Sequence, residues 1–235
     1  MVGTRQGDAD TFGREAKCAT ERAMSSSGSK RPLVFVGMSG VGKSHLSRVL
    51  GRGGFTVFDV DETIAGKLAS LVVPESGELP VYALGRWMGM PWTEGFAQRE
   101  AEYLALEERV TVASLERAFA SQKDSVIDTT GSVVYLSPEL RARLAESCRI
   151  IYFHTPESDR ERLREQYLRD PKPVCWGGLF RRLEDETPRD ATERLYPELL
   201  STRDALYREL AHEIIEGPEL RGITTDALCK RLALT

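Results

Sequence analysis

Several features that would place a chain in a specialised class are missing from these 235 residues. No apolar run approaches the ~18 residues of a membrane helix, so we expect a soluble, cytoplasmic protein without a membrane partner. The 32 basic and 36 acidic residues give a net charge of -4, which argues against a general nucleic-acid-binding surface. The four cysteines form no C-x-x-C pair, which excludes a zinc ribbon and is typical of a reducing compartment.

The chain divides into a tail and one domain. Residues 1–31 are rich in Gly, Ser, Thr and charge and show no sustained apolar period, so we predict a flexible N-terminal tail. Residues 32–235 are long enough for a single core. The tail contains acidic residues and is a poor match to a transit peptide, which leaves organellar targeting as the alternative to the cytoplasm.

One glycine-rich stretch carries the clearest chemical signal. Residues 37–44 read G-M-S-G-V-G-K-S and match the phosphate-loop pattern G-x-x-x-x-G-K-[ST] between an apolar run and an expected helix. Backbone N–H groups and the helix dipole bind phosphate in that context. We expect Lys43 to reach the β- and γ-phosphates and the Ser44 hydroxyl to hold Mg²⁺. The predicted ATP contacts are Gly37, Gly40, Val41, Gly42, Lys43, Ser44 and His45.

Carboxylates end two further β-rich runs. Asp59 and Asp61 end the run that begins at Phe55, and Asp128 ends the run 125–128. Ligands of an open parallel sheet bind outside the carboxyl ends of its strands, so these acids should lie near the phosphate loop. Asp59 and Asp61 could hold Mg²⁺ and accept a proton from an attacking hydroxyl. The alternative is a solvated turn in which Asp61 caps the next helix.

The remaining pattern predicts an α/β fold. Expected strands near 33–37, 55–59, 125–128, 149–153 and 213–215 alternate with helices, which is typical of a three-layer α/β/α domain with a five-stranded parallel sheet. The basic stretch 160–182 is broken by proline and glycine; it predicts either a lid at about 165–186 or a solvated helix and loop. The Trp- and Met-rich stretch 81–92 predicts either core or the wall of an acceptor pocket, with Arg86 as a candidate anion contact.

In order and spacing, these motifs resemble the shikimate kinase family of P-loop small-molecule kinases over roughly residues 33–234. The matching stretches are 37–44, 59–61, 95–100, 129–132, 172–174 and 203–207. The resemblance implies that Asp61 orients and deprotonates the acceptor hydroxyl and that Asp59 helps to hold Mg²⁺. It also implies that Lys172 is the lid cation and that Arg203 contacts substrate or phosphate.

The acceptor half departs from the family pattern. The family arginine that binds the shikimate carboxylate falls at Ala97, the family lid arginine falls at Lys172, and one glycine of three, Gly131, remains in the 129–132 loop. Asp128 adds a carboxylate that could serve the metal. We therefore predict an ATP- and Mg²⁺-dependent kinase for a hydroxyl of a small metabolite other than shikimate. The predicted substrate contacts are Asp61, Arg86, Arg99, Gly131 and Arg203.

Two alternatives remain open. The first is a true shikimate kinase in which Arg86 or Arg99 replaces the lost carboxylate contact. The second is a nucleotide-binding subunit or assembly factor that keeps the ATP site, has lost the acceptor and acts on a protein partner. ATP binding without transfer, and unchanged turnover in Asp61→Asn, would favour the second.

Overall fold

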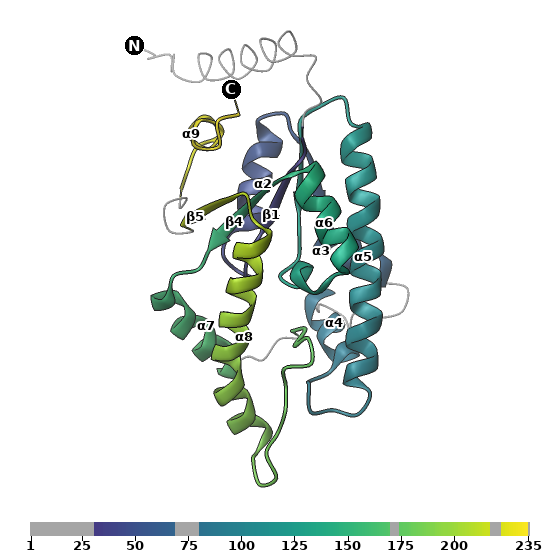
Figure 1. Cartoon of the computed structure of the whole chain (residues 1–235), viewed down its shortest axis with the longest axis vertical. Helices are drawn as coiled ribbons and strands as arrows, with labels where there is room; N and C mark the ends of the chain where they lie inside the picture. Colours follow the sequence, from purple (N-terminus) through teal and green to yellow (C-terminus); the bar gives the residue numbers. More distant parts are fainter. Residues whose placement is uncertain (1–30, 69–79, 170–173, 217–221, 235) are drawn as a thin grey trace, which may run out of the picture.

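The computed structural model of the chain describes residues 31–68, 80–169, 174–216 and 222–234 (Figure 1). Five strands form one parallel sheet in the order β2-β3-β1-β4-β5. They are β1 (Leu33–Val36), β2 (Thr56–Asp59), β3 (Ser125–Asp128), β4 (Arg149–His154) and β5 (Glu213–Glu216). The prediction of a five-stranded parallel sheet is confirmed, and each strand lies within two residues of its expected bounds.

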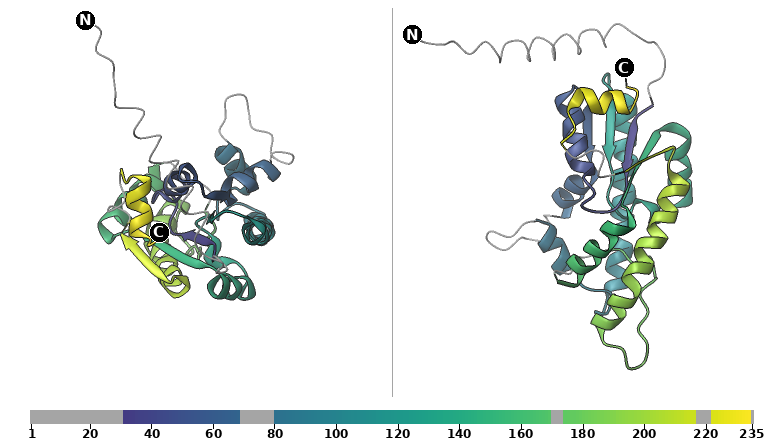
Figure 2. Two further views of the ribbon diagram at one scale, coloured as in Figure 1. Left: turned by 90° about the horizontal axis from the view of Figure 1, so that it is seen from above. Right: turned by 90° about the vertical axis from the view of Figure 1, so that its left-hand side faces the viewer.

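Helices cover both faces of this sheet (Figures 1 and 2). They are α2 (Lys43–Arg52), α3 (Val60–Leu68), α4 (Pro80–Met88), α5 (Phe96–Ala120), the short 3₁₀ helix η1 (Val133–Tyr135), α6 (Pro138–Ser147), α7 (Glu157–Arg169), α8 (Pro188–Leu210) and α9 (Thr225–Arg231). The three-layer α/β/α prediction is confirmed.

The alternation of side chains along β1 separates the two layers of the core. Leu33 and Phe35 pack with α2 and α9 on one face, whereas Val34 and Val36 pack with the helices from α3 to α8 on the other. All four side chains are buried because β1 is central in the sheet. A continuous apolar run is therefore what this strand position requires.

The strand order places a reversal point at β1. The chain leaves β1 with β3 on one side and β4 on the other, and all strands run in the same direction. In such sheets the crevice for ligands opens beyond the carboxyl ends of the strands at this reversal. The loop 37–42 occupies that position, and the register also brings Asp59 beside Asp128.

The predicted lid region contains two different structures. Helix α7 runs to Arg169, and residues 174–187 return without helix or strand to the start of α8. The backbone N–H groups of Trp176 and Gly177 both donate to the Glu100 carboxylate in the first turns of α5. Lys172 lies outside the described residues, so its predicted role and the closure of a lid over phosphate stay predictions.

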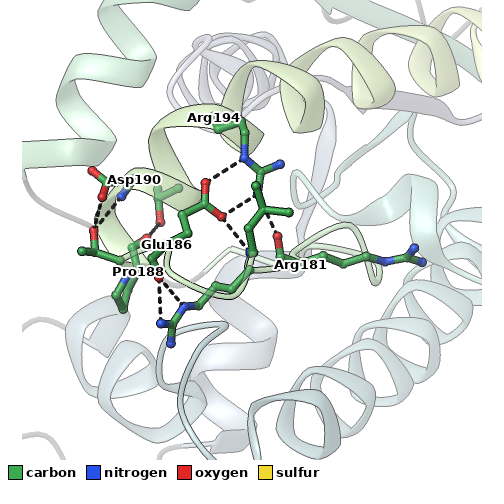
Figure 3. Close-up of polar contacts among 9 residues, drawn as sticks. Arg181, Glu186, Pro188, Asp190 and Arg194 are labelled. Atoms are coloured by element: carbon green, nitrogen blue, oxygen red, sulfur yellow. Dashed lines mark hydrogen bonds and ion pairs between the residues drawn. The ribbon is translucent and has the colours of Figure 1, made fainter.

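Glu186 ties the end of the 174–187 segment to α8 (Figure 3). Arg194 donates from Nε and Nη2 to the two Glu186 oxygens at 2.7 and 2.6 Å, and the Leu183 backbone N–H donates to one of them at 3.1 Å. Arg194 also reaches the Arg181 carbonyl at 2.9 Å. A bidentate pair with extra backbone contacts fixes geometry better than a single surface ion pair.

No helix within the described part of the chain combines the length and apolar composition that a membrane crossing needs.

The core of the α5 layer gives a stability prediction. Leu115 is fully buried, and its truncation in Leu115→Ala should lower the free energy of unfolding by about 3 kcal/mol, because a cavity remains where the side chain packed. Urea titration with an unchanged m-value measures this loss. The control Phe119→Ala lies one turn further on, where the ring is 45% exposed, and should change stability by under about 1 kcal/mol. Equal losses in both variants would contradict this packing.

Candidate functional site

The phosphate loop owes its shape to glycines with positive φ. Gly37 has φ 145°, and a Cβ there would lie 2.8 Å from the Phe153 carbonyl oxygen. Gly42, with φ 107°, directly precedes α2, and its carbonyl accepts the His45 and Leu46 N–H groups at 3.1 Å. Residues with a side chain rarely adopt these angles. The loop therefore holds its backbone N–H groups around the start of α2, as an anion-binding loop requires.

The side chain of Lys43 is hydrogen-bonded to this loop. Its ammonium donates to the Gly37 and Met38 carbonyls at 2.9 and 3.2 Å, and the residue is 6% exposed. Burial lowers the pKa of Lys43, while the charges of Asp128 and Asp61 oppose this shift. A buried cation among loop carbonyls is positioned to exchange those carbonyls for phosphate oxygens.

Asp128 presents an unsatisfied oxygen close to Lys43. Ser47 Oγ donates to Asp128 Oδ2 at 2.9 Å, whereas Oδ1 is buried without a well-formed hydrogen bond. Burial raises the pKa of Asp128, opposed by Lys43 and by the nearby Ser44 and Ser47 hydroxyls. A buried carboxylate oxygen without a donor, next to a serine hydroxyl, fits Mg²⁺, which takes oxygen ligands from few protein groups. The donor chemistry of the predicted metal residues therefore suits this ion.

Asp59 and Asp61 have different surroundings in the structure. Asp59 Oδ1 accepts the Glu62 backbone N–H at 2.8 Å, so Asp59, rather than Asp61, caps α3. Asp61 faces a cavity that solvent enters, with protein on its other sides. Burial on those sides raises the pKa of Asp61 to about 6, with Lys43 opposing the shift. A carboxylate with this pKa can accept a proton near neutral pH.

A cavity of about 440 Å³ adjoins the loop and Asp61. Its wall combines residues of the phosphate loop, α3, α4, α5, the 129–132 loop, α7, residues 174–175 and α8. Leu84 and Met88 of α4 contribute to the apolar part, so the Met- and Trp-rich stretch is partly a cavity wall. Trp92 instead packs against Phe180, with ring centroids 5.8 Å apart. The stretch therefore contributes buried Met88 to the core and lines this cavity, while its role in an acceptor pocket stays a prediction.

Arg203 of α8 is the buried cation of this cavity. Its Nη2 donates to the Cys175 carbonyl at 2.6 Å, its Nε donates to the Tyr135 hydroxyl at 3.4 Å, and the guanidinium lies 5.2 Å from the Tyr135 ring centroid. Nη1 lies toward Gly131, which also lines the cavity and whose carbonyl accepts the Tyr207 hydroxyl at 2.5 Å. The structure therefore brings Arg203 and Gly131 together at the cavity, as expected for substrate contacts.

Two other predicted substrate residues are placed elsewhere. Arg99 donates from Nε to the Met88 carbonyl and from Nη2 to the Glu94 carbonyl, both at 2.9 Å, so it fixes the turn between α4 and α5. Arg86 is exposed in the last turn of α4. Among the described residues, those that line the cavity include neither arginine nor Ala97. Arg86 and Arg99 as substrate contacts therefore stay predictions, which this structure does not favour because backbone carbonyls hold Arg99 and Arg86 faces solvent.

The sequence analysis missed Glu107. This glutamate of α5 is fully buried and accepts hydrogen bonds from the Thr130 and Ser132 hydroxyls, the second at 2.5 Å. A signal was available, because position 107 lies one turn after Tyr103 and one turn before Val110 on the apolar face of the helix. A glutamate on such a face must find polar partners inside the protein.

Three features together are typical of P-loop small-molecule kinases. They are the parallel sheet, the phosphate loop with its buried lysine, and the adjoining cavity. No family model matches the chain. It is 28% identical over 193 residues to a shikimate kinase of Dechloromonas aromatica, covering 81% of this chain and 84% of that protein. It is 29% identical over 211 residues to a shikimate kinase of Paracidovorax citrulli, covering 88% and 92%.

A solved structure shares the fold. The shikimate kinase from Bacteroides thetaiotaomicron superposes with a TM-score of 0.54 at 17% identity, over 86% of this chain and 97% of that one. The curated relatives support a shikimate kinase-like family of P-loop kinases for this chain, and the solved structure supports the fold.

The buried glutamate gives a pH prediction. Burial raises the pKa of Glu107 from 4.5 to about 7, so the folded protein keeps a proton there that the unfolded chain releases at lower pH. The free energy of unfolding should therefore fall as pH rises across this window, by on the order of 3 kcal/mol. Glu107→Gln should remove this part of the fall, measured by urea titration at several pH values.

A matched control is available one residue further along α5. Glu108 also accepts a serine hydroxyl, that of Ser137 at 2.6 Å, but at the start of α6. Glu108→Gln should keep the wild-type fall. The same pH dependence in Glu107→Gln as in the wild type would show that another group carries it.

Proposed function

We propose that the protein is an ATP- and Mg²⁺-dependent phosphotransferase that acts on a hydroxyl group of a small metabolite other than shikimate. The observation that carries the proposal is that buried Lys43 at the phosphate loop lies within the electrostatic reach of Asp128 and of Asp61, and Asp61 lines the adjoining cavity. Phosphoryl transfer depends mainly on positioning and on neutralising charge on the moving group. The three residues supply these functions together.

Each residue has a separate task in this proposal. The loop N–H groups and Lys43 bind the phosphates of ATP and neutralise charge on the transferred group. Asp61 orients the acceptor hydroxyl from the cavity and takes its proton. Ser44, Asp128 and Asp59 would hold Mg²⁺, which supplies positive charge to the phosphate oxygens when bound. Residues of about 165–186 would act as the lid over this site.

The acceptor half supports a substrate other than shikimate. Arg203 is the buried arginine at the cavity, and two of its nitrogens are already hydrogen-bonded to Cys175 and Tyr135. The position of the second family arginine is occupied by Ala97, and Arg99 binds backbone carbonyls instead. A carboxylate in this cavity would therefore meet Arg203 and the exposed Arg162 of α7 in place of the arginine pair of the family pattern.

A true shikimate kinase is the second candidate. Relatives named shikimate kinase align with most of the chain, and the guanidinium of Arg203 lies next to Gly131. The decisive experiment is ADP release from Mg-ATP with shikimate and with a panel of neutral hydroxyl compounds. Turnover with neutral alcohols above that with shikimate supports the proposal, and efficient turnover with shikimate favours the second candidate. ATP binding without transfer to any compound would contradict both.

Substitution of Lys43 should remove most of the transfer rate. Lys43→Met keeps most of the length of the unbranched side chain but removes the charge, so ADP release at saturating acceptor should fall by roughly 10²–10³-fold. Circular dichroism and thermal unfolding serve as the check on folding. A loss of less than about fivefold would contradict a role in charge neutralisation.

Substitution of Asp61 tests proton removal separately. Asp61→Asn should lower the rate of transfer by roughly 10²–10⁴-fold while ATP binding, measured by calorimetry, stays near that of the wild type. The matched control is Glu62→Gln, one residue further along and exposed, which should leave the rate unchanged. Retained turnover in Asp61→Asn would exclude this carboxylate as the base.

A further inference from the structure

Glu107 accepts hydrogen bonds from the hydroxyl groups of two residues in the cavity wall. The Thr130 hydroxyl donates to Glu107 Oε1, and the Ser132 hydroxyl donates to Oε2 at 2.5 Å. Thr130 and Ser132 both line the cavity, whereas Glu107 lies fully buried behind them. Each hydroxyl has a single hydrogen to donate. When Glu107 is ionised, both hydrogens therefore point away from the cavity.

This arrangement leaves two oxygens facing each other without a hydrogen between them. Thr130 Oγ1 and Ser132 Oγ are 2.9 Å apart, which is a hydrogen-bond distance. Thr130 Oγ1 also accepts the Ser132 backbone N–H at 3.0 Å, whereas the other polar neighbours of Ser132 Oγ are the Tyr103 hydroxyl and the Cys175 thiol. A donor from a ligand that bridges these oxygens would satisfy lone pairs that the protein leaves facing each other.

We propose that Glu107 turns the Thr130–Ser132 wall into a hydrogen-bond acceptor, so that this wall selects an acceptor molecule by its hydroxyl groups and disfavours a carboxylate. The inference rests on the proposed function, since it describes the acceptor side of the same cavity. A ligand hydroxyl donates its hydrogen to one of the two wall oxygens. A ligand carboxylate has no hydrogen to donate, so its lone pairs face those of the wall oxygens. Its negative charge also lies toward the negative charge of Glu107.

The charged and titratable groups around Glu107 fit this assignment. Asp61 from α3 adds negative potential, and Arg203 from α8 adds positive potential on the side of Gly131. Tyr103 on α5 and Cys175 in the 174–187 segment also surround it, and burial raises the pKa of both. No described side chain supplies a cation that hydrogen-bonds Glu107, so its charge is balanced mainly by the two hydroxyls.

The contact with Glu107 accounts for the hydroxyl residues in the loop sequence T-T-G-S. Thr130 and Ser132 stand on either side of Gly131, where the related family has glycines, and each makes a side-chain contact with Glu107. The glutamate and the hydroxyl residues therefore act as one unit. Glu107 does not touch the acceptor itself and is a positioning residue.

Binding of two matched compounds tests the proposal. Shikimate and its methyl ester carry the same ring hydroxyls and differ in the charge of one group. Calorimetry with the full chain, Mg²⁺ and ADP at a pH above 7 keeps Glu107 ionised. The ester should bind about tenfold more tightly than shikimate, the factor expected for one badly satisfied buried hydrogen bond.

Variants test whether Glu107 is the source of the preference. Glu107→Gln removes the charge and returns one hydroxyl hydrogen to the wall, so the preference for the ester should fall to under about threefold. Ser132→Ala removes one wall oxygen and should weaken ester binding, which keeps the proposal testable if the first variant does not fold. Glu108→Gln, with its serine contact outside the cavity wall, should keep the wild-type ratio.

A change of pH provides a readout that a purely structural role would not affect. At about pH 6 Glu107 gains a proton and donates to one of the hydroxyls, so the wild-type preference for the ester should shrink. Asp61 also titrates near this pH, and the Glu107→Gln protein shows its separate contribution. The pH-dependent change should be smaller in that variant than in the wild type.

Three outcomes overturn the proposal. They are tighter or equal binding of shikimate by the wild type, an unchanged ratio in both Glu107→Gln and Ser132→Ala, and no binding of either compound at millimolar concentration. An ADP-release assay on the same samples reports the proposed function independently. A binding preference without ADP release would support the role of Glu107 and contradict the proposed kinase activity. ADP release without a binding preference would support the kinase activity and contradict the role of Glu107.

Discussion

The position of β1 between β3 and β4 is the constraint on which the site depends. Parallel pairing on both sides buries this strand and forces the chain to leave it at the reversal point of the sheet. The turn then passes so close to the Phe153 carbonyl that Gly37 has no room for a side chain. The same pairing brings Asp128 to the start of α2, where Lys43 is buried.

The site balances charges that burial alone would disfavour. Desolvation lowers the pKa of Lys43 and raises those of Asp61 and Asp128, while their mutual attraction opposes each shift. Removing one member of such a set leaves the others buried and uncompensated. Under the proposed function, charged phosphates and a metal would complete the set, which gives a reason for a lysine that is buried among loop carbonyls.

The acceptor side follows a different principle, because its polar groups are arranged around a buried carboxylate. Glu107, Thr130 and Ser132 form one network, and Arg203 binds the Cys175 carbonyl and Tyr135. The 174–187 segment closes this side by donating backbone N–H groups to Glu100. Under the proposed function, recognition on this side depends on where the hydroxyl hydrogens of the wall point.

The sequence by itself determined the strands, the phosphate loop and the acids at the strand ends, because apolar runs, glycine spacing and strand termini are local properties of the chain. Tertiary structure decided which side chains meet at the cavity. Arg99 is close in sequence to the expected contact, yet it binds the Met88 and Glu94 carbonyls. Glu107 reaches Thr130 across 23 residues of chain. Such contacts depend on helix phase and on packing against the sheet, neither of which a short motif encodes.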